Sequence, residues 1–186
     1  GSIPSVAERT ITINGLSKSH AMTGWRIGFI ACPGDTGKAF IKGYATLQGQ
    51  MTTNITAFVY PAIRVAMTAC EDEVERMRLA FAERAKLTTT LLADVPGFDF
   101  VKPQGAFYVF PDISQTFGKK LPKGRPIHSA RDFADALLEE SEVAVVPGED
   151  FGGCGQNHIR ISFACSEADI KNGIARIRNF VESLSE

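Results

Sequence analysis

A polar segment between two strand-like runs constrains the fold more than any other feature of this sequence. Residues 10–14 (TITIN) alternate β-branched and polar side chains, and residues 26–31 (RIGFIA) form a second apolar run that ends at a Cys-Pro-Gly turn. Residues 15–25 between them are too few for a parallel crossover, so we expect the two strands to run antiparallel. The fold must then hold the polar segment at one end of a strand pair.

The remaining residues predict helices interleaved with short strands. Helical composition, hydrophobic spacing and an acidic first turn predict helices over residues 35–50, 55–70 and 71–93. Two capping boxes predict further helices that begin at Ser129 and at Ser166. Strands are expected at residues 98–101, 106–110, 143–146 and 158–164, the first two forming a hairpin. These elements together indicate an α/β or α+β fold.

The last expected strand carries a single charged side chain. Its apolar residues Ile159, Ile161 and Phe163 alternate with Arg160 and Ser162, so the two sets lie on opposite faces. By this pattern alone, Arg160 belongs to the surface side of a sheet.

Composition narrows the classes of partner. The formal net charge is −1 and the pI is near 6.4, with no basic stripe, which argues against a nucleic-acid or membrane-surface binder and favours a small polar ligand.

No apolar run is long enough to span a membrane, and the first residues lack the features of a signal peptide. The four cysteines are scattered, without CxxC pairs or metal spacing, which indicates free thiols and no metal site. We therefore expect a cytoplasmic protein.

The polar segment has a distinctive pattern of residues. It reads GLSKSHAMTGWRIG from Gly15 to Gly28, with Lys18 among small residues and Arg26 eight positions later. This pattern resembles the pyridoxal-phosphate attachment motif of class I and II aminotransferases, in particular those like aspartate aminotransferase. The resemblance continues through PQGAFY at 103–108, VVPG at 145–148 and HIRIS at 158–162.

The resemblance implies a fold and a division into domains. It covers the carboxyl-terminal half of a fold-type-I pyridoxal 5′-phosphate enzyme, an α/β transferase. Residues 1–70 would be the end of the large cofactor-binding domain, and residues 71–186 the complete small domain.

The resemblance also implies roles for four residues. Lys18 would form a Schiff base with the cofactor and then move protons at the substrate α-carbon, as an unprotonated amine can. Arg26 would bind the cofactor phosphate through its planar fork, and Ser17 would add a hydroxyl hydrogen bond. Arg160 would pair with the substrate α-carboxylate. We expect the neighbouring His20 to be a neutral loop residue, and Tyr108 to be a core or interface residue.

The expected activity is transfer of an amino group from an amino acid, with aspartate the expected donor, to a 2-oxo acid. The alternatives are a pyridoxal-phosphate lyase of the same fold and the ligand-sensing domain of a transcription regulator. The chain lacks an initial Met and opens almost at once on a strand, so we expect a fragment of a longer homodimeric enzyme. The groups that bind the pyridine nitrogen and stack on the ring would lie in the absent half. We therefore expect the fragment to be inactive alone, and to self-associate through its unpaired strands.

Overall fold

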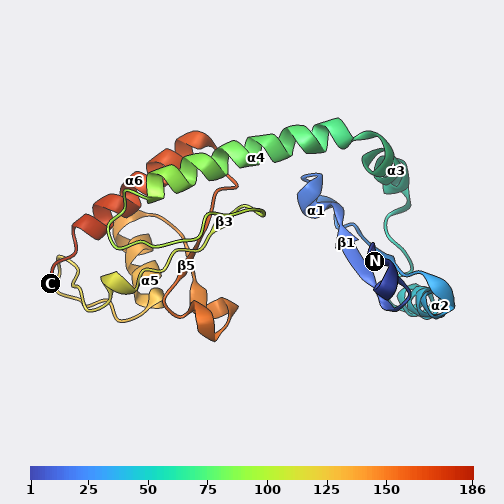
Figure 1. Cartoon of the computed structure of the whole chain (residues 1–186), viewed down its shortest axis with the longest axis horizontal. Helices are drawn as coiled ribbons and strands as arrows, with labels where there is room; N and C mark the ends of the chain where they lie inside the picture. Colours follow the sequence, from blue (N-terminus) through green and yellow to red (C-terminus); the bar gives the residue numbers. More distant parts are fainter. The chain divides into compact units, whose positions relative to one another are not determined.

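The computed structural model describes all residues from Gly1 to Glu186 and contains two compact units, Gly1–Arg76 and Met77–Glu186 (Figure 1). The division predicted at residue 70 concerns the domains of a longer enzyme, and it stays a prediction. No helix of the structure combines the length and the apolar character needed to cross a membrane.

The first unit contains the predicted strand pair. After the 3-10 helix η1 (Pro4–Arg9), strand β1 (Thr12–Gly15) pairs antiparallel with β2 (Gly28–Ala31), as the spacing predicted. Gly15 faces Gly28 at the end of this ladder, where a side chain on Gly15 would begin 2.9 Å from the carbonyl oxygen of Ile27. Glycine therefore permits the close approach of the two strands there. The short helices α1 (Leu16–Ser19) and η2 (Thr23–Trp25) fill the connection.

Helices complete the first unit around a small core. Helix α2 (Gly34–Met51), the turn η3 (Ala57–Val59) and α3 (Tyr60–Ala69) follow β2, and α4 (Glu71–Leu92) begins within this unit. The buried residues of the core are Leu16, Ile27, Val59 and Ala66. Because Leu16 and Ile27 bracket the polar segment, their burial against η3 and α3 fixes both of its ends.

The second unit is built on a three-stranded antiparallel sheet. Its strands are β3 (Tyr108–Val109), β4 (Val146–Pro147) and β5 (Ile159–Ser162), in the order β3-β5-β4.

The predicted hairpin of residues 98–101 and 106–110 is wrong. Only Asp99 bridges to Asp112, Val101 is 88% exposed, and β3 pairs with β5 instead. Strand β3 therefore joins the sheet through β5, and its segment contacts residues 98–101 only through the Asp99–Asp112 bridge.

Two capped helices pack on this sheet. Ser129 accepts a hydrogen bond from the Asp132 amide at 3.1 Å and starts α5 (Ala130–Ser141). Ser166 accepts one from the Asp169 amide at 3.1 Å and starts α6 (Glu167–Glu182). Both helices begin where the capping boxes predicted. The short turns η4 (Ser114–Thr116), η5 (Gly148–Phe151) and η6 (Gly153–Gly155) connect the remaining segments.

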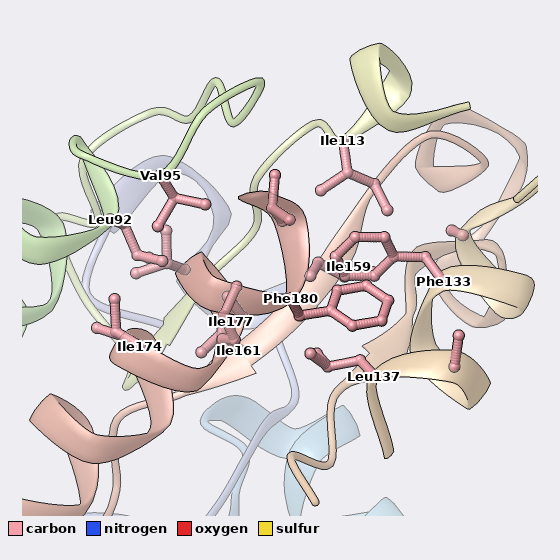
Figure 2. Packing of buried hydrophobic residues seen from close by; sticks show 14 of the residues in the cluster. Leu92, Val95, Ile113, Phe133, Leu137, Ile159, Ile161, Ile174, Ile177 and Phe180 are labelled. Atoms are coloured by element: carbon pink, nitrogen blue, oxygen red, sulfur yellow. The ribbon is translucent and has the colours of Figure 1, made fainter. Parts of the chain in front are cut away.

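Aromatic and aliphatic side chains fill the space between the helices and the sheet. Figure 2 shows Phe133 of α5 and Phe180 of α6 meeting beside Ile159 of β5. The two rings lie edge to face, with centroids 5.2 Å apart and planes at 89°. Ile159 and Ile161 are buried in this core, so Arg160 lies on the opposite face of β5, as the alternation predicted. The core therefore fixes the strand that carries Arg160.

Candidate active site

Lys18 lies on α1, a single helical turn that starts directly at the end of β1. The Leu16 amide donates to the Ile27 carbonyl at 3.3 Å, and the amides of His20 and Met22 donate to the Leu16 carbonyl at 3.2 and 3.4 Å. These bonds fold the polar segment into a compact loop above the strand ends. Lys18 is exposed on this loop, and its neighbour Ser17 is half-buried.

His20 ties the lysine loop to α3. Its Nε2 lies 2.9 Å from the carbonyl oxygen of Ala66, and its Nδ1 lies 2.8 Å from the hydroxyl oxygen of Ser19. Because a carbonyl only accepts, Nε2 carries the hydrogen, and Nδ1 accepts from the Ser19 hydroxyl in the neutral ring. These contacts give His20 a structural role, because they join the lysine loop to α3.

Arg26 lies beyond the same end of the strand pair as Lys18. It precedes β2 with a left-handed backbone (φ 56°), and its Nη1 donates to the Thr23 carbonyl at 3.1 Å. The turn η2, which ends just before Arg26, packs against α1. Arg26 forms no ion pair within the described residues, so the remaining N–H groups of its exposed guanidinium can bind an anion.

The donors on this loop fit pyridoxal phosphate in their chemistry. The cofactor carries an aldehyde, which needs a primary amine, and a phosphate, which needs cationic and hydroxyl donors. Lys18 provides the amine, Arg26 the guanidinium and Ser17 a hydroxyl within one loop. The sequence from Gly15 to Gly28 contains no acidic residue.

Arg160 lies in the second unit, between two aromatic rings. Its guanidinium carbon is 4.4 Å from the ring centroid of Tyr108 and 4.4 Å from that of Phe151. Its Nε is buried and has no hydrogen-bond partner. An unpartnered buried donor on a cation is unfavourable, and a bound anion would remove that penalty. This orphaned atom fits the expected carboxylate-binding role.

The sequence indicated Tyr108 only as a core or interface residue, and it indicated no role for Phe151. Tyr108 faces Ser162 across the sheet, which places it diagonal to Arg160 on the same face. Knowledge of the strand register would have predicted this contact. Phe151 reaches Arg160 from η5, and no spacing in the sequence indicates that approach.

The structure groups three of the four predicted residues. Ser17, Lys18 and Arg26 belong to the first unit, and Arg160 belongs to the second with its own neighbours. The roles predicted for all four stay predictions.

Cys165, which follows β5, is a packing residue. Burial raises the pKa of its thiol, and the carboxylate of Asp169 acts in the same direction. The thiol is therefore protonated near neutral pH and is a poor nucleophile.

Comparison with known proteins identifies the family. The model of the family "Aminotransferase class I and II" matches residues 2–177. The aspartate aminotransferase of Geobacillus stearothermophilus is 38% identical over 97% of this chain and 43% of its own length. A probable aspartate/prephenate aminotransferase of Aquifex aeolicus is 41% identical over 94% of this chain and 42% of its own length. The chain thus spans less than half the length of these curated relatives.

Solved structures agree with this result. The aspartate aminotransferase of Rhizobium meliloti is 38% identical, with a TM-score of 0.90 over 98% of this chain and 44% of its own. An aromatic aminotransferase of Pyrococcus horikoshii is 35% identical, with a TM-score of 0.83 over 97% of this chain and 45% of its own. The predicted α/β fold-type-I architecture and the resemblance to one half of such an enzyme are confirmed. On its sequence and its fold, this chain belongs to the class I and II aminotransferase family.

Proposed function

We propose that this chain is the carboxyl-terminal portion of a pyridoxal-phosphate-dependent aminotransferase that moves an amino group from an amino acid, with aspartate the expected donor, to a 2-oxo acid. The observation that carries the proposal is the loop that joins Lys18 and Arg26 beyond one end of the β1–β2 pair. Relatives named for aspartate and for aspartate/prephenate transfer support the donor. Their names also favour transfer over the lyase and ligand-sensor alternatives.

Arg26 and Ser17 bind the cofactor phosphate in this proposal. A guanidinium stays charged at any pH relevant to the enzyme and can present two parallel N–H donors to a phosphate. The bond from its Nη1 to Thr23 uses one of those donors and orients the rest. The Ser17 hydroxyl, half-buried on α1, supplies a further donor.

Lys18 holds the cofactor and moves the substrate proton. Pyridoxal phosphate, when bound, supplies an electron sink that weakens the bonds at the α-carbon of an amino acid. The Nζ of Lys18 would hold the cofactor through its aldehyde carbon, and as a free amine it would hold and move the α-proton of the substrate as general base. The hydrogen bonds that close the loop, including the bond of His20 to Ala66, limit the positions this amine can reach.

Arg160 binds the α-carboxylate of the amino acid. A planar guanidinium on a rigid strand suits a carboxylate, because two parallel N–H bonds set both the distance and the orientation. The buried Nε without a partner supports this role.

Further parts of the proposal concern the whole protein. We propose that residues 1–70 belong to a large cofactor-binding domain and residues 71–186 to a small domain, in a cytoplasmic homodimer. Exposed apolar side chains support association of the first unit with more protein, among them Ile13 on β1 at 74% and Met51 on α2 at 71% exposure. We propose that this chain is inactive without that additional protein.

Cofactor attachment tests the proposal. The chain is incubated with pyridoxal phosphate and reduced with borohydride, and the labelled peptide is identified by mass spectrometry. We expect one dominant label on Lys18, loss of that label in Lys18→Arg, and no change in the control Lys38→Arg. Lys38 is exposed on α2 and pairs with Asp35 at 3.0 Å, so it shares exposure but not the loop. Equal labelling of many lysines would contradict the role of Lys18.

The reaction type has its own test. In a protein preparation that consumes L-aspartate, amino-group transfer predicts that glutamate forms from 2-oxoglutarate and that no free ammonia is released. Release of ammonia in step with substrate loss would favour the lyase. Robust turnover by this chain alone would refute its expected inactivity.

A further inference from the structure

We propose that Tyr108 and Phe151 are positioning residues that hold the guanidinium of Arg160 ready for a carboxylate. This inference rests on the proposed function, since it assumes that Arg160 binds the substrate carboxylate. It adds two residues that act through Arg160, together with a reason for their aromatic character.

The two rings clamp the guanidinium from separate elements. Tyr108 comes from β3 and Phe151 from η5, and each ring centroid is 4.4 Å from the guanidinium carbon. Cations bind favourably over aromatic faces at this distance. With rings on two sides, the guanidinium loses most of its freedom to rotate about its last bonds. The N–H groups then point in fixed directions along one edge of the guanidinium plane.

The ring of Phe151 is itself supported, although the residue is 47% exposed. Phe110 packs edge-on against it, with centroids 6.0 Å apart and planes at 83°. Phe110 in turn stacks on His158 at 4.9 Å and 14°. The short helix η5 is also fastened to α5, because Arg131 pairs with both Glu149 and Asp150. The ring over Arg160 is therefore held in place from two sides.

The charges around the clamp leave Arg160 available to a ligand. The acidic residues nearest to Phe151 in the chain, Glu149 and Asp150, are both engaged by Arg131. Among the described residues, no carboxylate forms an ion pair with Arg160, and its Nε has no acceptor. Aromatic faces stabilise the charge without using the N–H groups, whereas a carboxylate from the protein would occupy them. The clamp thus fixes the cation and keeps its donors unoccupied.

Side-chain NMR of this chain tests the clamp. The chain is labelled with ¹⁵N-arginine, the Nε–H signal of Arg160 is identified by its loss in Arg160→Lys, and L-alanine is titrated. L-Alaninamide, which lacks the carboxylate charge, is the matched probe. We expect L-alanine to shift the Arg160 signal, and L-alaninamide to leave it unchanged.

Two variants remove one ring each while keeping an apolar side chain. Tyr108→Leu and Phe151→Leu are each expected to weaken L-alanine binding about threefold to tenfold, as loss of one cation–π contact predicts. Tyr108→Phe retains the aromatic face and should bind like the wild type. Phe98→Leu is the matched control, because it removes a ring that packs on Phe133 and not on Arg160. Circular dichroism confirms the fold of each variant, and Phe151→Tyr replaces Phe151→Leu if that variant unfolds, with wild-type binding expected.

The outcomes separate the clamp from the proposed function. Wild-type affinity in both leucine variants, with Arg160 still responding to L-alanine, would overturn the clamp and leave the carboxylate role intact. Weak binding in Tyr108→Phe or Phe151→Tyr would also overturn it, because the ring face is retained. An Arg160 signal that ignores L-alanine in the wild type would overturn the carboxylate role, and the clamp with it.

Discussion

Replacing Phe133 by Leu tests the aromatic packing beneath the strand that carries Arg160. Phe133 is fully buried, and it contacts Phe180 at 5.2 Å edge to face and Phe98 at 6.1 Å. Leucine fills part of the ring's volume, so the lost burial is worth roughly 1 kcal/mol. Each lost aromatic pair adds about 0.5–1.5 kcal/mol. We expect the free energy of unfolding to fall by about 2–4 kcal/mol.

Urea unfolding followed by far-ultraviolet circular dichroism measures this loss. Leu138→Ala is the control, because Leu138 lies on the same helix α5 but is 53% exposed, and it should change stability by no more than about 0.5 kcal/mol. In a double-mutant cycle, Phe133→Leu and Phe180→Leu should couple by about 0.5–1.5 kcal/mol, since the rings touch. A loss no larger than the control's, or additive effects of the two substitutions, would refute the packing argument.

Three further perturbations test local features of the second unit. Ser166→Ala removes the N-cap of α6 and should cost about 1 kcal/mol in thermal unfolding, while Ser166→Asp restores an acceptor and most of the stability; equal losses in both variants would contradict the cap. The backbone amide of His128 lowers the pKa of Asp132, so this carboxylate stabilises the fold above its unfolded pKa of about 4, and that stabilisation disappears as the pH falls through the lower folded pKa. The difference in melting temperature between wild type and Asp132→Asn should therefore shrink from pH 7 to pH 3, and a constant difference would argue against the shift. Gly148→Ala would press a methyl group against the backbone carbonyl of η6 and should cost about 1–3 kcal/mol in urea, whereas Gly153→Ala meets open space and should be close to neutral; similar effects of the two would count against the close approach.

Much of the local structure was predictable because its causes lie within a few residues. The first turn of α4 is filled by acidic residues, and α5 and α6 start at Ser129 and Ser166 because those side chains accept bonds from amides three residues on. The antiparallel β1–β2 pair followed from the shortness of its connection. The spacing of Lys18 and Arg26 within that connection indicated the family, and the comparisons confirmed it.

Other features depend on contacts between residues far apart in the chain. Strand β3 pairs with β5, which lies far along the chain, and its residue Val109 is buried in the core that this sheet covers. The ring of Phe151 reaches Arg160 because η5 is held near α5 by the ion pairs of Arg131. The hydrogen bond from His20 to Ala66 joins residues 46 positions apart.

The sequence by itself determined the main helices, the N-caps of α5 and α6, the β1–β2 pair and the loop that carries Lys18, because periodicity, capping and turn chemistry act over a few residues. Only the tertiary structure decided the partner of β3 and the two rings over Arg160. The physical reason is that strand pairing and cation–π contacts depend on which surfaces are buried together, and many partners along the chain satisfy the same local pattern.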